Sequence, residues 1–206
     1  MKKLFLGLGL VAGTFAFAQT SPMFGVKAGM NVSSLSTEEG LSDQGSKIGF
    51  YGGLFMNAPL SEQFSIQPEL IYSQYGDKYD YVNPLNDQRY SYSRNLDYIA
   101  LPVMFQYNAT PSFYLEAGPE FGLLVSAKNK AKNESQNDVI DTSGNYKDNL
   151  NNFNVGVGLG AGYYFTPNIG ITARYTAGLT DINKSENNDG DAVRNNVFQV
   201  GLAYKF

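Results

Sequence analysis

The feature that most constrains the fold of this chain is an alternation of apolar and polar residues that recurs in eight separate stretches. A period of two indicates a β-strand, because successive side chains point to opposite faces of a sheet. The stretches cover residues 24–34, 47–57, 63–76, 96–107, 112–126, 153–165, 168–179 and 195–206. In the last stretch Phe198, Val200, Leu202, Tyr204 and Phe206 share one face, whereas polar or small residues occupy the other. The chain is therefore predicted to be all-β.

The connections between these stretches alternate in length. Three are short, at 58–62, 108–111 and 166–167, and four are long and polar, at 35–46, 77–95, 127–152 and 180–194. In an up-and-down antiparallel sheet this order puts every short turn at one end. Outer-membrane barrels have short periplasmic turns and long external loops. The order predicts an eight-stranded antiparallel up-and-down transmembrane β-barrel of that kind.

The polar faces indicate which side of the barrel is inside. A soluble ligand-binding barrel would turn its polar faces to water, and a membrane barrel turns them to the lumen. These faces consist mainly of Gly, Ser, Thr, Asn, Gln and Ala, and they include a row of glycines at 156, 158, 160 and 162. A water-exposed surface carries many more charges, and a narrow lumen needs small residues. The membrane barrel is the favoured interpretation.

Six charged residues are predicted to point into this lumen: Lys27, Glu69, Glu116, Glu120, Arg174 and Lys205. Glu69, Glu120 and Arg174 are expected near mid-height, and the other three nearer the periplasmic end. Three charges of each sign suit a packed interior, because an unpaired buried charge is costly. A selectivity ring in a narrow pore is the alternative, but the lumen of eight strands is nearly filled by side chains. We expect a plug.

The first 18 residues have the pattern of a secretory signal peptide. Lys2 and Lys3 precede an apolar run, and Ala16-Phe17-Ala18 fits a cleavage site. The apolar run is shorter than the roughly 20 residues that a membrane-spanning helix needs. Cleavage between Ala18 and Gln19 would leave residues 19–206 as one exported barrel domain, and we expect it in the outer membrane.

The composition excludes several classes of function. The chain has no His and no Cys, which removes the usual general bases, thiol nucleophiles and most transition-metal ligands. We therefore expect no enzyme activity, no catalytic residue, no cofactor and no metal site. Acidic external loops could offer oxygen ligands to calcium, but they lack the EF-hand spacing. A net charge of −4 argues against nucleic-acid binding.

An exported chain without disulfides must be held together by other means. A closed barrel pairs every backbone N–H and C=O within the lipid, which meets that need. Aromatic residues near the strand ends are expected to form the interfacial girdles in the absence of Trp. The candidates are Phe64, Tyr72, Tyr75, Tyr98, Tyr107, Phe113, Tyr163, Phe165, Tyr175 and Tyr204.

Several strings in this order resemble a known family. They are SIQPELIYSQYGDK (65–78), LDYIALPVMFQYN (96–108), EAGPEFGLLVSAK (116–128), FNVGVGLGAGYYF (153–165), ITARYTAGLTDIN (171–183) and NNVFQVGLAYKF (195–206). The set is similar to the PorT-type porin family of outer-membrane β-barrel proteins in Gram-negative bacteria. The resemblance covers most of the chain after the signal peptide and implies an eight-stranded outer-membrane barrel. Its name comes from a component of a secretion system, and the family has no single function.

The C-terminal stretch has the pattern of an assembly signal. Phe198, Val200, Leu202, Tyr204 and Phe206 alternate up to a terminal aromatic residue. This looks like the segment that the outer-membrane barrel-assembly machinery reads, so that machinery is an expected partner during biogenesis, beside the lipid itself. An ordinary last strand that ends in Phe is the alternative.

Three prolines lie in the middle of predicted strands, at Pro68, Pro102 and Pro119. Each removes a backbone donor from the ladder. We expect β-bulges at these positions.

The leading functional hypothesis is an integral outer-membrane barrel with a structural, envelope-stability or surface-interaction role and a lumen plugged by side chains. The alternative is a narrow or gated pore, or an accessory component of a secretion complex. The long external loops would hold any specificity for a partner.

Overall fold

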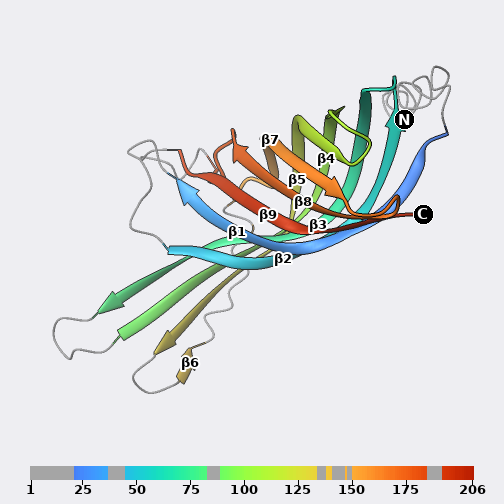
Figure 1. The fold of residues 1–206 in the computed structure, drawn as a ribbon. Helices are drawn as coiled ribbons and strands as arrows, with labels where there is room; N and C mark the ends of the chain where they lie inside the picture. Colours follow the sequence, from blue (N-terminus) through green and yellow to red (C-terminus); the bar gives the residue numbers. More distant parts are fainter. Residues whose placement is uncertain are drawn as a thin grey trace.

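The computed structural model describes residues 21–36, 45–82, 89–133, 138–140, 147, 150–184 and 192–206. The strands are β1 (Met23–Ser36), β2 (Gly45–Pro59), β3 (Phe64–Val82), β4 (Arg89–Asn108), β5 (Phe113–Asn133), β6 (Asp138–Ile140), β7 (Phe153–Tyr164), β8 (Ile169–Gly178) and β9 (Arg194–Lys205). Every neighbouring pair is antiparallel, and β9 returns to pair with β1. Eight strands close the barrel, while the short β6 pairs only with the outer end of β5 (Figure 1). The predicted fold class is confirmed.

The two faces of the strands have the predicted orientation. Phe50, Leu159 and Leu202 point outward with 59–68% of their surface exposed. Lys27 and Arg174 point into the lumen and are at most 4% exposed. Exposed apolar side chains cover the outside of the strands, as a membrane barrel requires. None of the described ranges contains a helix that could cross a bilayer.

The three short turns use the same hydrogen bond. Ser61, Thr110 and Thr166 each accept a bond at the side-chain oxygen from the backbone N–H three residues later, at 2.9–3.1 Å. This N–H belongs to the first residue of the next strand, which is Phe64, Phe113 or Ile169. A hydroxyl at this position closes the turn locally. A local side-chain bond therefore contributes to each turn, and the third turn is also bonded to Lys205 of β9 through Asn168.

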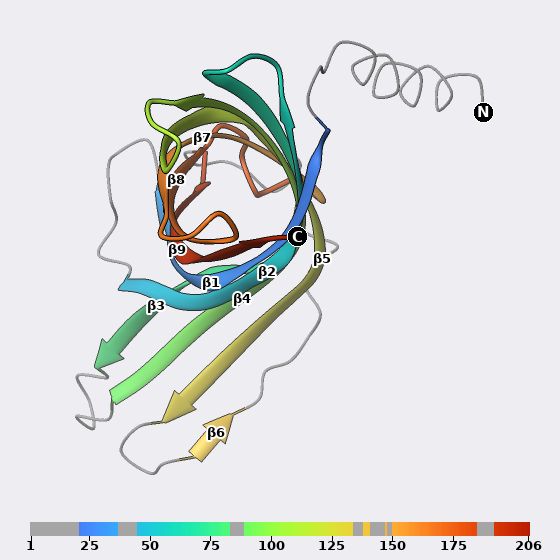
Figure 2. The same cartoon turned by 45° about the vertical axis from the view of Figure 1, so that its right-hand side comes forward.

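Two of the predicted long loops are partly strand. β3 and β4 remain paired as far as Val82 and Arg89, and β4 and β5 as far as Tyr90 and Asn133. Figures 1 and 2 show these strands running on beyond β1 and β9 as a sheet that leans away from the barrel. The apolar alternation ends where the outward face leaves the lipid, but the backbone ladder continues. The strand ends at 76, 96 and 126 were therefore predicted too short.

The expectation of bulges at the three prolines is wrong. The register is the same on both sides of Pro68, Pro102 and Pro119, and each proline keeps a paired position in one of its two ladders. In an antiparallel sheet each N–H points toward only one neighbouring strand, so the missing donor weakens one ladder. The register shifts lie elsewhere, within Ser46–Tyr51 of β2 and next to Tyr98 of β4.

The girdle prediction is wrong for two aromatic residues. Tyr75 and Tyr98 lie inside the barrel, where they are 2% and 0% exposed. The other eight candidates are exposed, as girdle residues must be. Phe64 and Tyr107 pack against each other close to the short turns, with ring centroids 5.4 Å apart.

The predicted signal peptide, including the cleavage site at Ala18 and Gln19, lies outside the described residues. Of the acidic loop stretches considered for calcium, 186–191 lies outside them as well, and 134–141 does so apart from β6 (Asp138–Ile140).

Candidate functional site

The centre of the lumen is organised by one guanidinium group. Arg174 of β8 forms a bidentate pair with Glu69 of β3, at 2.9 Å from Nη1 to Oε2 and 2.7 Å from Nη2 to Oε1. Its Nε and Nη2 also lie 2.7 Å from Oε1 of Glu116 on β5. Arginine suits this position because its planar fork of donors matches two carboxylates at once.

A second cation completes this group. Lys27 of β1 donates from Nζ to Oε1 of Glu69 at 2.7 Å. Lys27, Glu69, Glu116 and Arg174 form the central charge cluster: two positive and two negative side chains, all nearly inaccessible to solvent. They come from β1, β3, β5 and β8, so the cluster crosses the lumen between opposite walls. Its formal charges cancel, as burial demands.

The backbone register explains how Arg174 and Glu116 meet. Gly160 of β7 is paired with Glu116 on one side and with Arg174 on the other. A Cβ at Gly160 would lie 2.9 Å from Oε1 of Glu116 and 2.6 Å from the backbone oxygen of Ala173. The glycine row of β7 therefore provides the space in which the central charge cluster packs.

Two of the six predicted lumenal charges do not belong to this cluster. Glu120 accepts hydrogen bonds from the hydroxyls of Tyr75 at 2.8 Å and Thr176 at 3.3 Å. Lys205 lies near the short-turn end with its Nζ 3.9 Å from the ring centroid of Tyr164. All six predicted charges thus lie on inner faces, but only four of them meet. Glu116, expected nearer the periplasmic end, joins the cluster by pairing with Arg174, and Lys27 joins it by pairing with Glu69.

Neutral polar side chains form the next layer toward the short turns. Asn57 donates to Gln106 at 2.7 Å and to Gln67 at 3.2 Å. Gln106 and Gln67 in turn donate to Glu116 and Glu69, at 3.0 and 2.8 Å. These amides give Glu69 and Glu116 further hydrogen-bond donors. They connect the central charge cluster to the part of the barrel next to the short turns.

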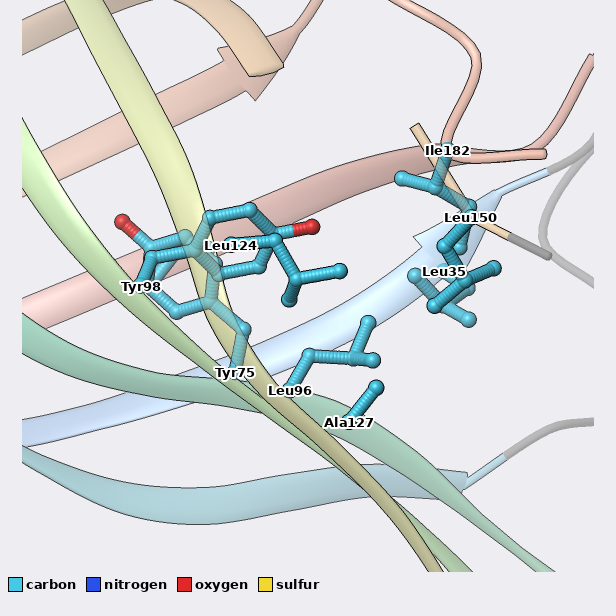
Figure 3. Packing of buried hydrophobic residues seen from close by; sticks show 9 residues of the cluster. Leu35, Tyr75, Leu96, Tyr98, Leu124, Ala127, Leu150 and Ile182 are labelled. Carbon is cyan, nitrogen blue, oxygen red and sulfur yellow. The ribbon is translucent and has the colours of Figure 1, made fainter. Parts of the chain in front are cut away.

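The layer toward the external end contains an apolar cluster that the sequence did not predict, beside the buried polar residues Lys47, Asp77 and Asn195. Buried side chains from five strands and two connections pack together there (Figure 3). They are Leu35, Tyr75, Leu96, Tyr98, Leu124, Ala127, Leu150, Ile182 and Val197. This set is called the apolar cap below. Its strand residues lie on inner faces that carry polar side chains nearer the short turns.

Two residues of the apolar cap come from connecting segments. Leu150 precedes β7, and Ile182 follows β8. Asn151 joins the two segments by donating from Nδ2 to the backbone oxygens of Asp181 and Asn183, at 2.9 and 2.7 Å. Its own N–H bonds to Ile182 at 2.8 Å. The external end is therefore closed by chain that folds inward over the lumen.

Sequence reasoning missed several lumenal residues that alternation could have identified. Tyr75 is an even number of residues from Glu69 on the same strand, and Tyr98 is similarly placed relative to Gln106. Lys47 also points inward and donates to the backbone oxygen of Tyr75 at 3.0 Å. Nothing in the local sequence marks Leu150 and Ile182 as cap residues.

The carboxylates of Glu69 and Glu116 are bonded to other side chains of the barrel. Within the part of the chain that the structure describes, no group of three or more acidic side chains is placed to hold a metal ion. The carboxylates of the central charge cluster are engaged by Arg174, Lys27 and amides, so none is free to act on a substrate. The predicted assembly-signal residues Phe198 to Phe206 lie on the outer face of the last strand and its end, 38–71% exposed.

Comparison with known proteins supports the class of molecule. The model of the family described as "outer membrane protein beta-barrel domain" matches residues 17–184. The search of curated proteins found no match.

Solved outer-membrane barrels show the same architecture. Neisserial surface protein A is 17% identical, with a TM-score of 0.50, over 91% of this chain and all of that chain. Ail, the attachment invasion locus protein of Yersinia pestis, is 13% identical with a TM-score of 0.47, over 91% and 100%. The outer membrane protease OmpT of Escherichia coli is 13% identical with a TM-score of 0.41, over 90% and 96%. At 17% identity, the likeness to neisserial surface protein A concerns the fold alone.

Proposed function

The chain belongs to the outer membrane protein beta-barrel domain family, and from this premise we propose that it is a structural barrel of the outer membrane whose lumen is closed to solutes. Its role would be in envelope stability or surface interaction. The absence of His and Cys supports a role without enzymatic chemistry.

The observation that carries this proposal is the double closure of the lumen. The central charge cluster links β1, β3, β5 and β8 through contacts of 2.7–2.9 Å. The apolar cap then packs in the external end above it, beside the buried Lys47, Asp77 and Asn195. An ion would have to separate paired charges and then pass tightly packed, nearly inaccessible side chains, and each step is costly.

Single-channel recording in planar bilayers tests the proposal. We expect no steady conductance from the wild-type barrel. A variant with Lys27, Glu69, Glu116 and Arg174 all changed to Ser removes the cross-lumen side chains without changing the net charge, and it should conduct once Leu150 and Ile182 are also changed to Gly. A steady open state in the wild type would refute the closed lumen.

The alternative of an accessory component of a secretion complex is supported by the PorT-type resemblance alone. Co-purification from native membranes separates the two roles, since a complex member would retain stoichiometric partners after mild detergent extraction. Export by cleavage after Ala18 belongs to the same proposal, and sequencing the N-terminus of the membrane-extracted protein tests it.

A further inference from the structure

Four lysines lie on the outer face of the sheet that continues beyond the barrel. They are Lys78 of β3 and Lys128, Lys130 and Lys132 of β5, and all four side chains are exposed. They are called the lysine row below. Its function is independent of whether the lumen is closed.

The register places these lysines side by side. Lys78 pairs with Ser93 of β4, and Ser93 pairs with Lys130. Directly paired residues of an antiparallel sheet point to the same face. The register shift beside Tyr98 leaves Val125 without a partner in β4. The outward positions of β5 beyond it are therefore Ser126, Lys128, Lys130 and Lys132, while Ala127 is buried.

This face is the continuation of the lipid-facing side of the barrel. The last outward apolar residues below it are Tyr72 on β3, Ile99 on β4 and Val125 on β5, each 37–46% exposed. Lys128 follows Val125 by three residues, which is about 10 Å along a strand and less along the membrane normal of a tilted barrel. A headgroup layer is roughly 5–8 Å thick, so the lysine row begins at its level.

The four lysines outnumber the two acidic residues at outward register positions, which are Asp97 and Asp80; Asp80 pairs with Ser91, the partner of Lys132. Among the residues that the structure describes, none of the four lysines forms an ion pair with an acidic side chain. The nearby pair of Arg94 and Asp77, 3.3 Å apart, involves a buried carboxylate on the other face. Asp97 is half-buried on the outward face, between the apolar residues and Lys128.

We propose that the lysine row binds the phosphate groups of outer-leaflet lipids whose headgroups carry a net negative charge. Lysine ammonium groups are strongly attracted to phosphate, and their long stems let them reach back toward the membrane from above it. Figure 2 shows the outer parts of β3, β4 and β5 leaning away from the barrel. In a membrane, this lean would bring their outer face over the lipid headgroups. A lipid occupant is favoured over a free polyanion because the row continues directly from the apolar face.

Binding of a diphosphorylated glycolipid to the full-length barrel in neutral detergent tests this proposal, with native mass spectrometry to count bound lipid. The variant K128Q/K130Q should bind it roughly tenfold more weakly than wild type, because each lysine contributes to attraction at an anionic surface. The control K147Q/K184Q removes the same charge from other external segments and should bind like wild type. A heat-dependent gel shift confirms that each variant is folded.

Further binding measurements identify the ligand. They use phosphatidylcholine, inorganic phosphate, a heparin-like sulfated polysaccharide, the variant K128R/K130R and two salt concentrations. Phosphatidylcholine and inorganic phosphate at matched concentration should show no difference between wild type and K128Q/K130Q, whereas K128R/K130R should retain the glycolipid. Raising the salt from 0.05 to 0.5 M should weaken the wild type far more than the variant. Equal glycolipid affinity in wild type and K128Q/K130Q would overturn the proposal. So would a loss confined to a heparin-like sulfated polysaccharide, which would assign the lysine row to a soluble polyanion.

Discussion

The inner and outer halves of the lumen close the barrel by opposite means. The inner half is closed by the central charge cluster and its amides, all of which are side chains of barrel strands. The outer half is closed by the apolar cap, to which Leu150 and Ile182 contribute from connecting segments. The inner closure is therefore an intrinsic part of the barrel, whereas the outer one depends on chain that folds in from outside it.

Breaking the inner closure should have the largest effect. Arg174→Met leaves Glu69 and Glu116 buried without their shared cation, and loss of one partner of a buried charged group costs about 3–5 kcal/mol. We expect a loss of this size in the free energy of unfolding, measured by denaturant titration in lipid vesicles.

Removing one carboxylate together with the guanidinium provides the control for that experiment. The double variant R174M/E116Q should recover part of the lost stability, because Lys27 and Glu69 then remain as a neutral pair 2.7 Å apart. If Arg174→Met alone costs less than 1 kcal/mol, the cluster does not hold the inner half together.

Breaking the outer closure should cost less and stay local. Ile182→Ala removes a side chain that is 2% exposed, and such truncations cost about 2–4 kcal/mol when they leave a cavity. Amide hydrogen exchange should accelerate in the two connecting segments and at the outer strand ends, while the inner half stays protected. Leu179→Ala, at a position 57% exposed, is the matched control and should leave exchange unchanged. Uniform acceleration throughout the barrel would show that the halves are not independent.

A smaller change tests the packing beneath the central charge cluster. Gly160→Ala introduces a Cβ 2.9 Å from the Glu116 carboxylate and 2.6 Å from backbone oxygen, and we expect a loss of about 1–3 kcal/mol. Gly52→Ala is the control, because its Cβ would meet nothing closer than 3.7 Å. Equal unfolding free energies for the two variants would show that the inner half tolerates added volume.

The smallest effect concerns the short turns at the inner end. Thr166→Ala removes the hydroxyl that accepts the N–H of Ile169 at 2.9 Å, at a cost of about 1 kcal/mol. Thr166→Ser keeps the acceptor and should match wild type in the same denaturant titration. A loss as large in Thr166→Ser would assign the effect to the methyl group.

The sequence predicted the lumenal residues of the inner half better than those of the outer half. Arg174, Glu69 and Glu116 were identified from alternation, because the side-chain period of a strand does not depend on its neighbours. That Glu120 and Lys205 stand apart from the central charge cluster depends on register across the closed sheet, which alternation along one strand does not encode.

In the outer half, the alternation of apolar and polar residues no longer indicates the strands or their apolar contacts. Leu96 and Leu124 point inward although the lumen below them is polar, because the apolar cap places them against Leu150 and Ile182. The long polar stretches at 77–95 and 127–152 also hid the outer parts of β3, β4 and β5. Outside the lipid, neither face of a strand needs apolar residues, so the alternation that indicates a strand disappears while the backbone pairing persists.

The sequence by itself determined an eight-stranded barrel, its lipid-facing side, its short turns and most of its lumenal charges. These properties follow from a period of two and from local hydrogen bonds such as that of Thr166. The tertiary structure alone decided which charges meet, that Gly160 lies between two of them, and that Leu150 and Ile182 complete the apolar cap. Those outcomes depend on contacts between residues far apart in the chain, and only closure of the barrel brings these residues together.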